Sequence, residues 1–591
     1  MRRKRGLEVF VLWLILLVLP LSSHGATCFL TSVADKSTAI PGGSGNFAGF
    51  QDPVISNGDV VFIGNNSLSQ RGVYAKINGT LNRVADTSTP IPGGSGNFGV
   101  FDSCVISNGN IAFVGYGPGQ GPEQQRGVYA KINGILNRVA DTSTPIPGGS
   151  GNFIDFLSLV ISGGNIAFVG YGPGQQQGIY TNIGGVLNRL ADKSTPVPGG
   201  SGNFSMFTQV VISNGNVAFL GYNSSAQPGI YTSIGGALNR LADAGTPIPG
   251  GSGNFVDFGD PVISNGIVAF VGQGIGERGI YTNIDGALNR LADTSTPVPP
   301  GGSGDFEGFL YPAIDNGRVA FVGLNSGGMP GIYTNIGGTL NRLADTNTPI
   351  PDGSDDFFVS FGPAKISDGN VAFKASGSGG QSGIYAGMGG GLSRLADTRT
   401  PIPGGSGDFT TFQNPVINNG YVAFTGSGDG QGGIYIGSCP IPWTGSVSFP
   451  VRITSVDNAS GDSKFQNLTN HFSGKIEAYV GGNGFVPNED GCYIKFSGDD
   501  KTAICIKHAG SASTDVQKNR TDRLLLVGTG EMTLPIEGVL KPGVAYVDFK
   551  GALKKDGSGS VVSIGLNGKL GCSGSDFVCS GSYRSTLTEE K

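Results

Sequence analysis

The sequence predicts an all-β protein: an eight-bladed β-propeller closed by its N-terminal strand, followed by a small β-sandwich or barrel domain. Three observations lead to this fold class. The 104 Gly and 33 Pro make up about 23% of the 591 residues, roughly twice their usual share, which excludes a mostly helical chain. A unit of about 51 residues recurs eight times along the chain. Each unit holds four short apolar segments that are separated by turn residues.

The first 25 residues have the order of a secretory signal peptide. Basic residues at 2–5 precede an apolar run at 9–21, and small residues follow it. The run is shorter than the roughly 20 residues that a membrane-spanning helix needs, so we expect cleavage near Gly25 and no transmembrane segment after it. A lipidated Cys28 is the alternative. We therefore expect a secreted or cell-surface protein.

The repeat is anchored by the phrase Ala-Asp-x-x-Thr-Pro-Ile-Pro-Gly-Gly, which returns with little change. Its aspartates lie 50 to 55 residues apart. They are Asp35, Asp86, Asp141, Asp192, Asp243, Asp293, Asp345 and Asp397. Within each unit, Val-Ile-Ser and Asn-Val-Ala-Phe flank an Asn-Gly or Gly-Gly pair, which is a strong hairpin signal because both residue types tolerate positive φ.

Four strands in a repeat of this length are typical of a propeller blade. Residues 30–35 have the form of the last strand of a unit, whereas the final copy stops after Tyr435 without that strand. We therefore expect a propeller over residues 26–439 in which the N-terminal strand completes the blade of residues 405–438. Such closure leaves no open sheet edge.

The cysteines suggest three disulfides in an oxidising compartment. Cys28 and Cys439 bracket the repeats, and sharing one blade would bring them together. Cys492 with Cys505, and Cys572 with Cys579, are the preferred further pairs among several. Cys104 would remain as a buried thiol.

The repeat phrases Ala-Asp-Thr-Ser-Thr-Pro-Ile-Pro-Gly-Gly and Ile-Ser-Asn-Gly-Asn-Val-Ala-Phe resemble those of the bacterial choice-of-anchor tandem-repeat proteins, named for an NxxGxxAF motif. The resemblance covers residues 26–439, and 417–420 come nearest to the family's turn. It implies an exported protein of the bacterial envelope and no known chemistry. The chain departs from that family at its end, because residues 580–591 carry no apolar tail.

The composition excludes several functions. The net charge of −5 becomes about −8 once residues 1–25 are removed, and no basic run follows, which argues against nucleic acid as a partner. The only histidines are His24, His471 and His508, so the repeats hold no Ser-His-Asp triad and no His-ligated metal. We expect no catalytic and no cofactor-binding residues.

Two interpretations compete for the repeated aspartates. In the first, each Asp ends a strand and hydrogen-bonds the Thr-Pro turn that follows it. In the second, eight carboxylates ring a channel and bind Ca²⁺. We favour the first, and we expect the arginines that precede seven of the aspartates by three positions to form ion pairs between blades.

Residues that are identical in every copy perform a task that every blade shares, which is folding. Specific recognition is therefore expected where the copies differ, in the loop that follows Asn-Val-Ala-Phe. These loops are Asn65 to Arg71, Tyr116 to Arg126, Tyr171 to Gln177, Tyr222 to Pro228, Gln273 to Arg278, Leu324 to Pro330 and Ala375 to Ser382.

Residues 440–591 lose the repeat and alternate apolar and polar residues between Gly and Asp turns, which predicts the second β domain. Our leading hypothesis is an exported, non-enzymatic binding or structural scaffold, with a surface protein or a glycan as partner and the C-terminal domain serving attachment. The alternative is an extracellular polysaccharide hydrolase or lyase that uses Asp and Tyr residues of the channel.

Overall fold

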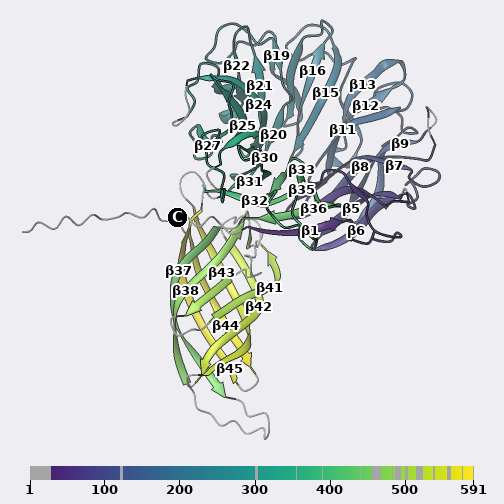
Figure 1. Ribbon diagram of the computed structural model, residues 1–591. Coiled ribbons are helices and arrows are strands. Elements are labelled where there is room, and N and C mark those ends of the chain that lie inside the picture. Colours follow the sequence, from purple (N-terminus) through teal and green to yellow (C-terminus); the bar gives the residue numbers. More distant parts are fainter. Residues whose placement is uncertain are drawn as a thin grey trace, which may run out of the picture.

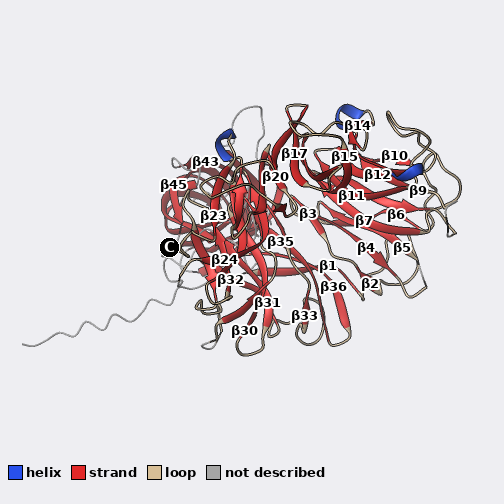
Figure 2. Cartoon of the chain, turned by 90° about the horizontal axis from the view of Figure 1, so that it is seen from above, coloured by secondary structure: helices blue, strands red, loops and turns tan. Residues whose placement is uncertain are grey.

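The computed structural model describes residues 28–439 except 69, 120, 122–123, 300–303, 354–355 and 389–390, and beyond them the backbone of the strands between 441 and 589. The regular secondary structure of this part is almost entirely strand, and helical segments are confined to short turns, drawn in blue in Figure 2. Residues 29–438 form eight separate antiparallel sheets. This is the predicted eight-bladed propeller.

Blades 1 to 4 follow each other in chain order. Blade 1 contains β2 (Gly49–Phe50), β3 (Val54–Ser56), β4 (Asp59–Asn65), β5 (Arg71–Ile77) and β6 (Thr80–Asp86). Blade 2 contains β7 (Val100–Ser107), β8 (Asn110–Tyr116), β9 (Arg126–Ile132) and β10 (Ile135–Asp141). Blade 3 contains β11 (Asp155–Ser162), β12 (Asn165–Gly172), η1 (Pro173–Gln175), β13 (Gln176–Thr181), η2 (Ile183–Gly185) and β14 (Asn188–Asp192). Blade 4 contains β15 (Phe204–Ser213), β16 (Asn216–Asn223), β17 (Pro228–Ile234) and β18 (Ala237–Asp243).

Blades 5 to 8 repeat the pattern. Blade 5 contains β19 (Asp257–Phe258), β20 (Val262–Ser264), β21 (Ile267–Gln273), β22 (Arg278–Thr282), η3 (Ile284–Gly286) and β23 (Asn289–Asp293). Blade 6 contains β24 (Phe306–Asp315), β25 (Arg318–Asn325), β26 (Pro330–Thr334) and β27 (Asn341–Asp345). Blade 7 contains β28 (Phe358–Phe361), β29 (Lys365–Ser367), β30 (Asn370–Gly377), β31 (Ser382–Met388) and β32 (Gly391–Asp397). Blade 8 contains β33 (Thr411–Phe412), β34 (Val416–Asn418), β35 (Tyr421–Gly428), β36 (Gln431–Ser438) and β1 (Phe29–Asp35).

The ring closes through the first strand of the chain. β1 pairs with β36 in antiparallel register from Phe29 opposite Ser438 to Asp35 opposite Gly433, and the two lie side by side in Figure 1. A disulfide joins Cys28 to Cys439 beside this pair. Both predictions, the shared blade and the bracketing disulfide, are therefore confirmed.

A circle of hydrogen bonds links the inner edges of the blades. The first strands of neighbouring blades contact one another around the ring, so they line the central channel. The last residue of each accepts a hydrogen bond from the turn N–H of the next blade: Ser56 from Asn108, for example, at 2.9 Å. The eighth such bond, from the Asn57 N–H to Asn418, closes the circle at 2.6 Å. These turns are Asn-Gly in six blades, Gly-Gly in blade 3 and Asp-Gly in blade 7, because both residues have positive φ, 53° and 81° at Asn57 and Gly58.

The core between blades consists of the repeated aromatic residues. In blade 2 the ring of Phe98 meets Tyr129 edge-on at 4.8 Å and Phe113 at 5.5 Å, and all three are buried. A Cβ at Gly115 would lie 2.7 Å from the Phe98 ring, which explains the glycine there. The same packing recurs in the other blades, as in Phe153 with Tyr180. Cys104 is buried, as predicted, and burial raises the pKa of its thiol to about 12.

The C-terminal region is one closed sheet, the barrel of the two predicted alternatives. Its strands are β37 (Ile441–Ser455), β38 (Leu468–Gly481), β39 (Gly484–Phe485), β40 (Ile494–Gly498), β41 (Ala503–Ser513), β42 (Arg523–Ile536), β43 (Val539–Lys555), β44 (Val561–Gly574) and β45 (Phe577–Glu589). β37 pairs with both β38 and β45, which closes the sheet. Cys572 and Cys579 are register partners on β44 and β45, while Cys492 lies outside the described residues. Both further disulfides remain predictions. In the part of the chain described, no helix is long and apolar enough to cross a bilayer.

Candidate functional site

The inner strand of every blade loses its regular pairing shortly after the second Phe of the Phe-x-x-Phe motif, through a bulge or a break between two strands, and the two residues that follow this Phe differ in every copy. This pair of residues directly follows the second Phe of the Phe-x-x-Phe motif. After it the inner strand continues to its last residue, which is Ser in six blades, Asp in blade 6 and Asn in blade 8. In blade 3 the register against β12 shifts between Leu157 and Val160, and in blade 6 against β25 between Leu310 and Ala313. The pairs are Gln51-Asp52, Asp102-Ser103, Leu157-Ser158, Thr208-Gln209, Gly259-Asp260, Leu310-Tyr311, Gly362-Pro363 and Gln413-Asn414. No two of them are alike.

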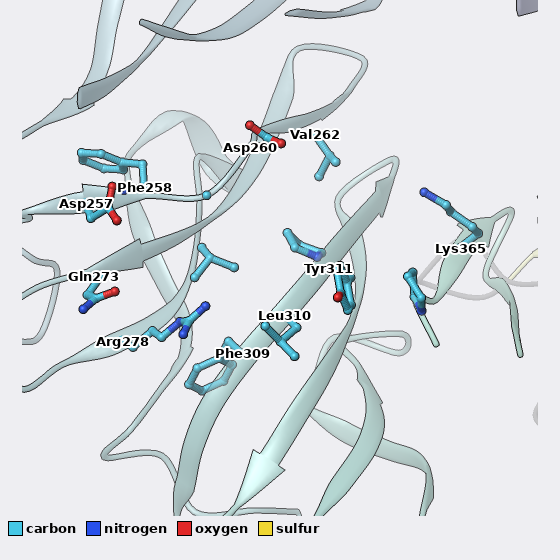
Figure 3. Close-up of a pocket in the computed structure, with 14 residues that line it drawn as sticks. Asp257, Phe258, Asp260, Val262, Gln273, Arg278, Phe309, Leu310, Tyr311 and Lys365 are labelled. Atoms are coloured by element: carbon cyan, nitrogen blue, oxygen red, sulfur yellow. Dashed lines mark hydrogen bonds between the residues drawn. The ribbon is translucent and has the colours of Figure 1, made fainter. Parts of the chain in front are cut away.

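A cavity of about 460 Å³ lies where the inner edges of blades 5, 6 and 7 meet. It has the size of a small-molecule site. Figure 3 shows side chains from the three blades around it, with Asp260, Tyr311 and Lys365 on separate elements. Its lining residues are Asp257, Phe258, Gly259, Asp260, Val262, Val271, Gln273, Arg278, Phe309, Leu310, Tyr311, Pro312, Pro363 and Lys365.

Lys365 is the odd residue in a ring of equivalent positions. The residue two places before the last one of the inner strand is Val in six blades and Ala in blade 6, and only blade 7 has Lys. Its amine end points into the pocket (Figure 3). Although solvent reaches the side chain, burial within the channel wall lowers the pKa of the ammonium group. Within the described chain it has no hydrogen-bond or ion-pair partner.

Arg278 also lacks the partner that its counterpart has. In blade 2 the equivalent Arg126 reaches across to Asp155 of blade 3, at 3.4 Å. The position of blade 6 that corresponds to Asp155 is Gly308, which has no side chain to offer. Consistent with this, Arg278 Nε is buried without a hydrogen-bond partner among the described residues. The substitution of Gly for Asp leaves this guanidinium free to face the pocket.

Two carboxylates and an aromatic ring complete the pocket. Burial raises the pKa of Asp260, and burial together with the charges of Asp257 and Asp260 raises the pKa of Tyr222. Tyr311 is 54% exposed and has a φ of 51°, a left-handed conformation that is unusual for a bulky residue. Such strain at an exposed aromatic residue is characteristic of functional positions. The pocket thus offers cations, anions and a flat apolar surface.

The repeated aspartates do not line the channel. Each ends the outermost strand of its blade, at the edge of the sheet farthest from the inner strands. Asp141 Oδ1 accepts from the N–H and hydroxyl of Ser143 at 2.9 and 2.6 Å and from the Thr144 hydroxyl at 3.0 Å. Its Oδ2 accepts from Arg138 and Gln125, both at 3.0 Å. This is the geometry of the structural turn, the first of the two interpretations.

Electrostatics at Asp141 follow from those bonds. Burial alone would raise the pKa of the carboxyl group, but the hydrogen bonds from Ser143, Arg138, Gln125 and Thr144 outweigh it and hold the pKa below its usual value. With five donors on two oxygens, little lone-pair capacity is left for a cation. Among the described residues, no three His, Cys, Asp or Glu side chains come together in a way that could hold a metal ion.

The ion pairs lie within blades, which corrects the prediction that they join blades. Arg138 and Asp141 are three residues apart on the same strand, and six other copies show the same pair, from Arg83 with Asp86 to Arg394 with Asp397. The reason is a bulge in the outermost strand, where the register shifts between Arg138 and Ala140. This bulge brings the side chains of Arg138 and Asp141, three positions apart, to the same face of the strand. In the first copy the Ser32 hydroxyl replaces the arginine.

The sequence pointed to the variable loops and missed the bulge pairs. Of the seven loops, Gln273 to Arg278 contributes its two end residues to the pocket. The signal for the bulge was present, since the two residues after Phe-x-x-Phe change in every copy. The sequence alone does not show that these two residues belong to the channel wall, because their place follows from the pairing of the inner strand with its neighbour.

A family model described as "Family of unknown function (DUF7453)" matches residues 23–176, 107–283, 159–330 and 272–438. These four overlapping matches together span the propeller and confirm its internal repetition. They do not bear on the resemblance to choice-of-anchor proteins. No curated protein matches the chain.

Solved structures with a similar arrangement are distant. The β-propeller domain of the trilobed protease of Pyrococcus furiosus is 12% identical, with 60% of this chain and 100% of that chain covered and a TM-score of 0.37. A puromycin-hydrolyzing peptidase of Mycobacterium tuberculosis is 12% identical, with 58% and 53% covered and a TM-score of 0.34. A lectin of Aleuria aurantia in complex with alpha-methyl-L-fucoside is 12% identical, with 51% and 97% covered and a TM-score of 0.23. At such identities the likeness concerns the fold alone.

Proposed function

We propose that this chain, which belongs to the family of unknown function DUF7453, is an exported, non-enzymatic binding scaffold that recognises its ligand on the wall of the propeller channel. One observation supports this most directly. The residues shared by all copies are used in packing and in turns, whereas the polar and aromatic residues that single out the 460 Å³ pocket between blades 5, 6 and 7, namely Asp260, Tyr311 and Lys365, differ from their counterparts in most other copies. Unpaired charges in such a pocket are typical of a binding site.

Export to the surface of a bacterial cell, or beyond it, is part of the proposal. It rests on the signal-like residues 1–25, on the family resemblance of the repeats, and on the Cys28–Cys439 disulfide, since structural disulfides persist in oxidising compartments. The C-terminal domain, which begins after the ring has closed, would then serve attachment or contact with a partner.

Screening the purified chain on immobilised extracellular glycans and envelope proteins tests the proposal. We expect binding that is lost in Tyr311→Asn, because Asn occupies the same bulge position in blade 8 and tolerates positive φ. The matched control is Ile135→Thr, which changes an exposed residue of an outermost strand to its blade 1 counterpart. Equal loss of binding in both variants, or no binding to any partner, would contradict the assignment of the channel wall.

The pocket also favours a second candidate, a polysaccharide hydrolase or lyase. Asp257, Asp260 and Tyr311 share one cavity, and the raised pKa of Asp260 suits a general acid. Release of new reducing ends from a polysaccharide, abolished in Asp260→Asn, would establish this function. Binding without turnover would favour the scaffold.

A further inference from the structure

The charges of the pocket between blades 5, 6 and 7 specify the ligand more closely, if the proposed function holds. Of its two cations, Lys365 has no counterpart in the other copies, and Arg278 has lost the carboxylate that pairs with the equivalent arginine of blade 2. Lys365 replaces Val or Ala, and Arg278 faces Gly308 where its counterpart Arg126 faces Asp155 at 3.4 Å. Neither has an ionic partner in the described chain. Lys365 is exposed toward the cavity, and Arg278 is half-buried with its Nε unpaired among the described residues. Two cations without partners in one cavity favour a negatively charged ligand.

The acids of the pocket restrict the kind of anion. Asp260 has no hydrogen-bond partner among the described residues, and Asp257 accepts one bond, from the N–H of Phe258 at 2.8 Å. An ionised carboxylate only accepts hydrogen bonds. A sulfate also only accepts them, and a phosphate has at most one or two hydroxyls to donate at neutral pH, so either compact anion would be repelled by these two groups. A ligand that carries hydroxyls beside its anionic group can instead donate to them.

The shape of the wall agrees with a sugar ring. Tyr311, 54% exposed and held outward by its left-handed backbone, presents an aromatic face from blade 6 between the acid on blade 5 and the amine on blade 7. Aromatic faces pack against the apolar side of a sugar while its hydroxyls reach polar groups at the edge. Gln273 adds an amide that both donates and accepts.

We infer that this pocket binds an acidic sugar, a uronic acid unit of a polysaccharide. Lys365 binds its carboxylate, Asp260 accepts from its hydroxyls and Tyr311 packs on the ring. Arg278 and Asp257, at the other end of the pocket, take the carboxylate and a hydroxyl of a neighbouring unit. The copies at the other blades lack this combination, so the propeller carries one such site in spite of its eightfold repetition.

Calorimetric titration of the full chain with trigalacturonic acid tests the inference, with neutral galactotriose and inorganic phosphate as comparison ligands. We expect the acidic trisaccharide to bind at least about tenfold more tightly than either. Two variants take the residue of another blade, so they preserve the fold: Lys365→Val, as in blade 5, and Arg278→Gln, as Gln177 in blade 3. Each should weaken binding about 10- to 100-fold. Lys193→Ala, in a half-exposed turn after the outermost strand of blade 3, is the control and should change nothing.

The remaining outcomes separate this inference from the proposed function. Equal affinity for the neutral and acidic sugars, unchanged in Lys365→Val but lost in Tyr311→Asn, would overturn the acidic ligand and leave the binding scaffold intact. Tighter binding of phosphate than of sugar would make the pocket an inorganic anion site and also overturn it. If neither sugar nor phosphate binds, and no partner emerges from the wider screen, the proposed function fails as well.

Discussion

The outer and inner edges of a blade use charged residues in opposite ways. At the outer edge of blade 2, the Asp141 carboxylate is fully buried and accepts five hydrogen bonds from its own turn and strand. At the inner edge of blade 7, Lys365 extends into a cavity and has no partner within the described chain. The outer residue recurs in all eight copies, and the inner one occurs once.

This difference shows which positions of a repeat protein can differ in sequence between its copies. The outer turn must connect one blade to the next in every copy, so its aspartate is fixed by a local network that any blade needs. The two residues at the inner bulge differ in every copy, so no side-chain contact shared by all blades fixes them. Function is therefore expected at the inner edge, at some cost in stability.

The largest effect is expected where the repetition ends. Removing the disulfide in the double variant Cys28→Ser with Cys439→Ser takes away a link between residues 411 apart. In the chain-entropy model, closure of so long a loop is worth about 5 to 6 kcal/mol, which is an upper estimate for measured cases. We expect a clear fall in the thermal midpoint of the propeller. Amide hydrogen exchange should become fastest in β1 and β36, because these strands are then joined by pairing alone.

Reductant provides the control for that experiment. It should speed exchange in β1 and β36 of the native chain to the rate of the double variant, and it should leave those strands of the double variant unchanged. Unaltered exchange at β1 after loss of the disulfide would mean that pairing alone closes the ring.

A smaller effect is expected at the outer turn. Asp141→Asn replaces an acceptor that is shared by five donors, and we expect a loss of about 1 to 3 kcal/mol in chemical denaturation. Asp243→Asn is the matched comparison, because Gly245 stands where five of the other turns, that of Asp141 among them, have a serine hydroxyl, and the Asp243 side chain is 15% exposed. Its loss should be smaller. Equal losses would show that the serine hydroxyl contributes little.

The same turn gives a pH dependence with a defined sign. The pKa of Asp141 is lowered in the folded state from 3.8, so its contribution is present above that value and is lost as the pH falls through the folded pKa. The pKa values of five further aspartates are lowered in the same way: Asp35, Asp86, Asp192, Asp293 and Asp397. Thermal midpoints should therefore fall steeply below about pH 4, and the gap between the native chain and Asp141→Asn should shrink there.

The same contrast explains what could be predicted. The phrase around Asp141 and the unit lengths were enough to derive eight blades and their closure through β1, because local turn and strand signals repeat eight times. The pocket could not be derived. It depends on Lys365, Tyr311 and Arg278, which are 33 to 87 residues apart and meet only through blade order. The bulge in the outermost strand could not be derived either, because it shows only in the pairing of the strands. It is the reason why Arg138 pairs with Asp141 of its own strand and not with a neighbouring blade.

The inner circle of hydrogen bonds should be worth less than the outer turn. Ser264→Ala removes the hydroxyl that accepts from the Asn316 N–H at 2.9 Å, and we expect a loss of about 1 kcal/mol in denaturation. Ser264→Asn should restore most of it, because Asn418 takes the same place in blade 8 and accepts from Asn57. A loss as large as that of Asp141→Asn would mean that the inner edge is as constrained as the outer one.

The smallest predicted effect has the opposite sign. Lys365→Val gives blade 7 the residue of six other blades, and we expect it to raise stability by no more than about 0.5 kcal/mol, because the channel wall then desolvates no ammonium group, although solvent already screens much of this charge. The folded-state pKa of Lys365 lies below the usual 10.5, so the unfolded chain binds more protons and the native chain gains stability as the pH rises. The advantage of the variant should therefore narrow above neutral pH. Val262→Lys in blade 5 should destabilise by a similar amount. If Lys365→Val instead lowers the midpoint of unfolding, the amine stabilises the fold. The inner edge of blade 7 would then serve stability and not recognition.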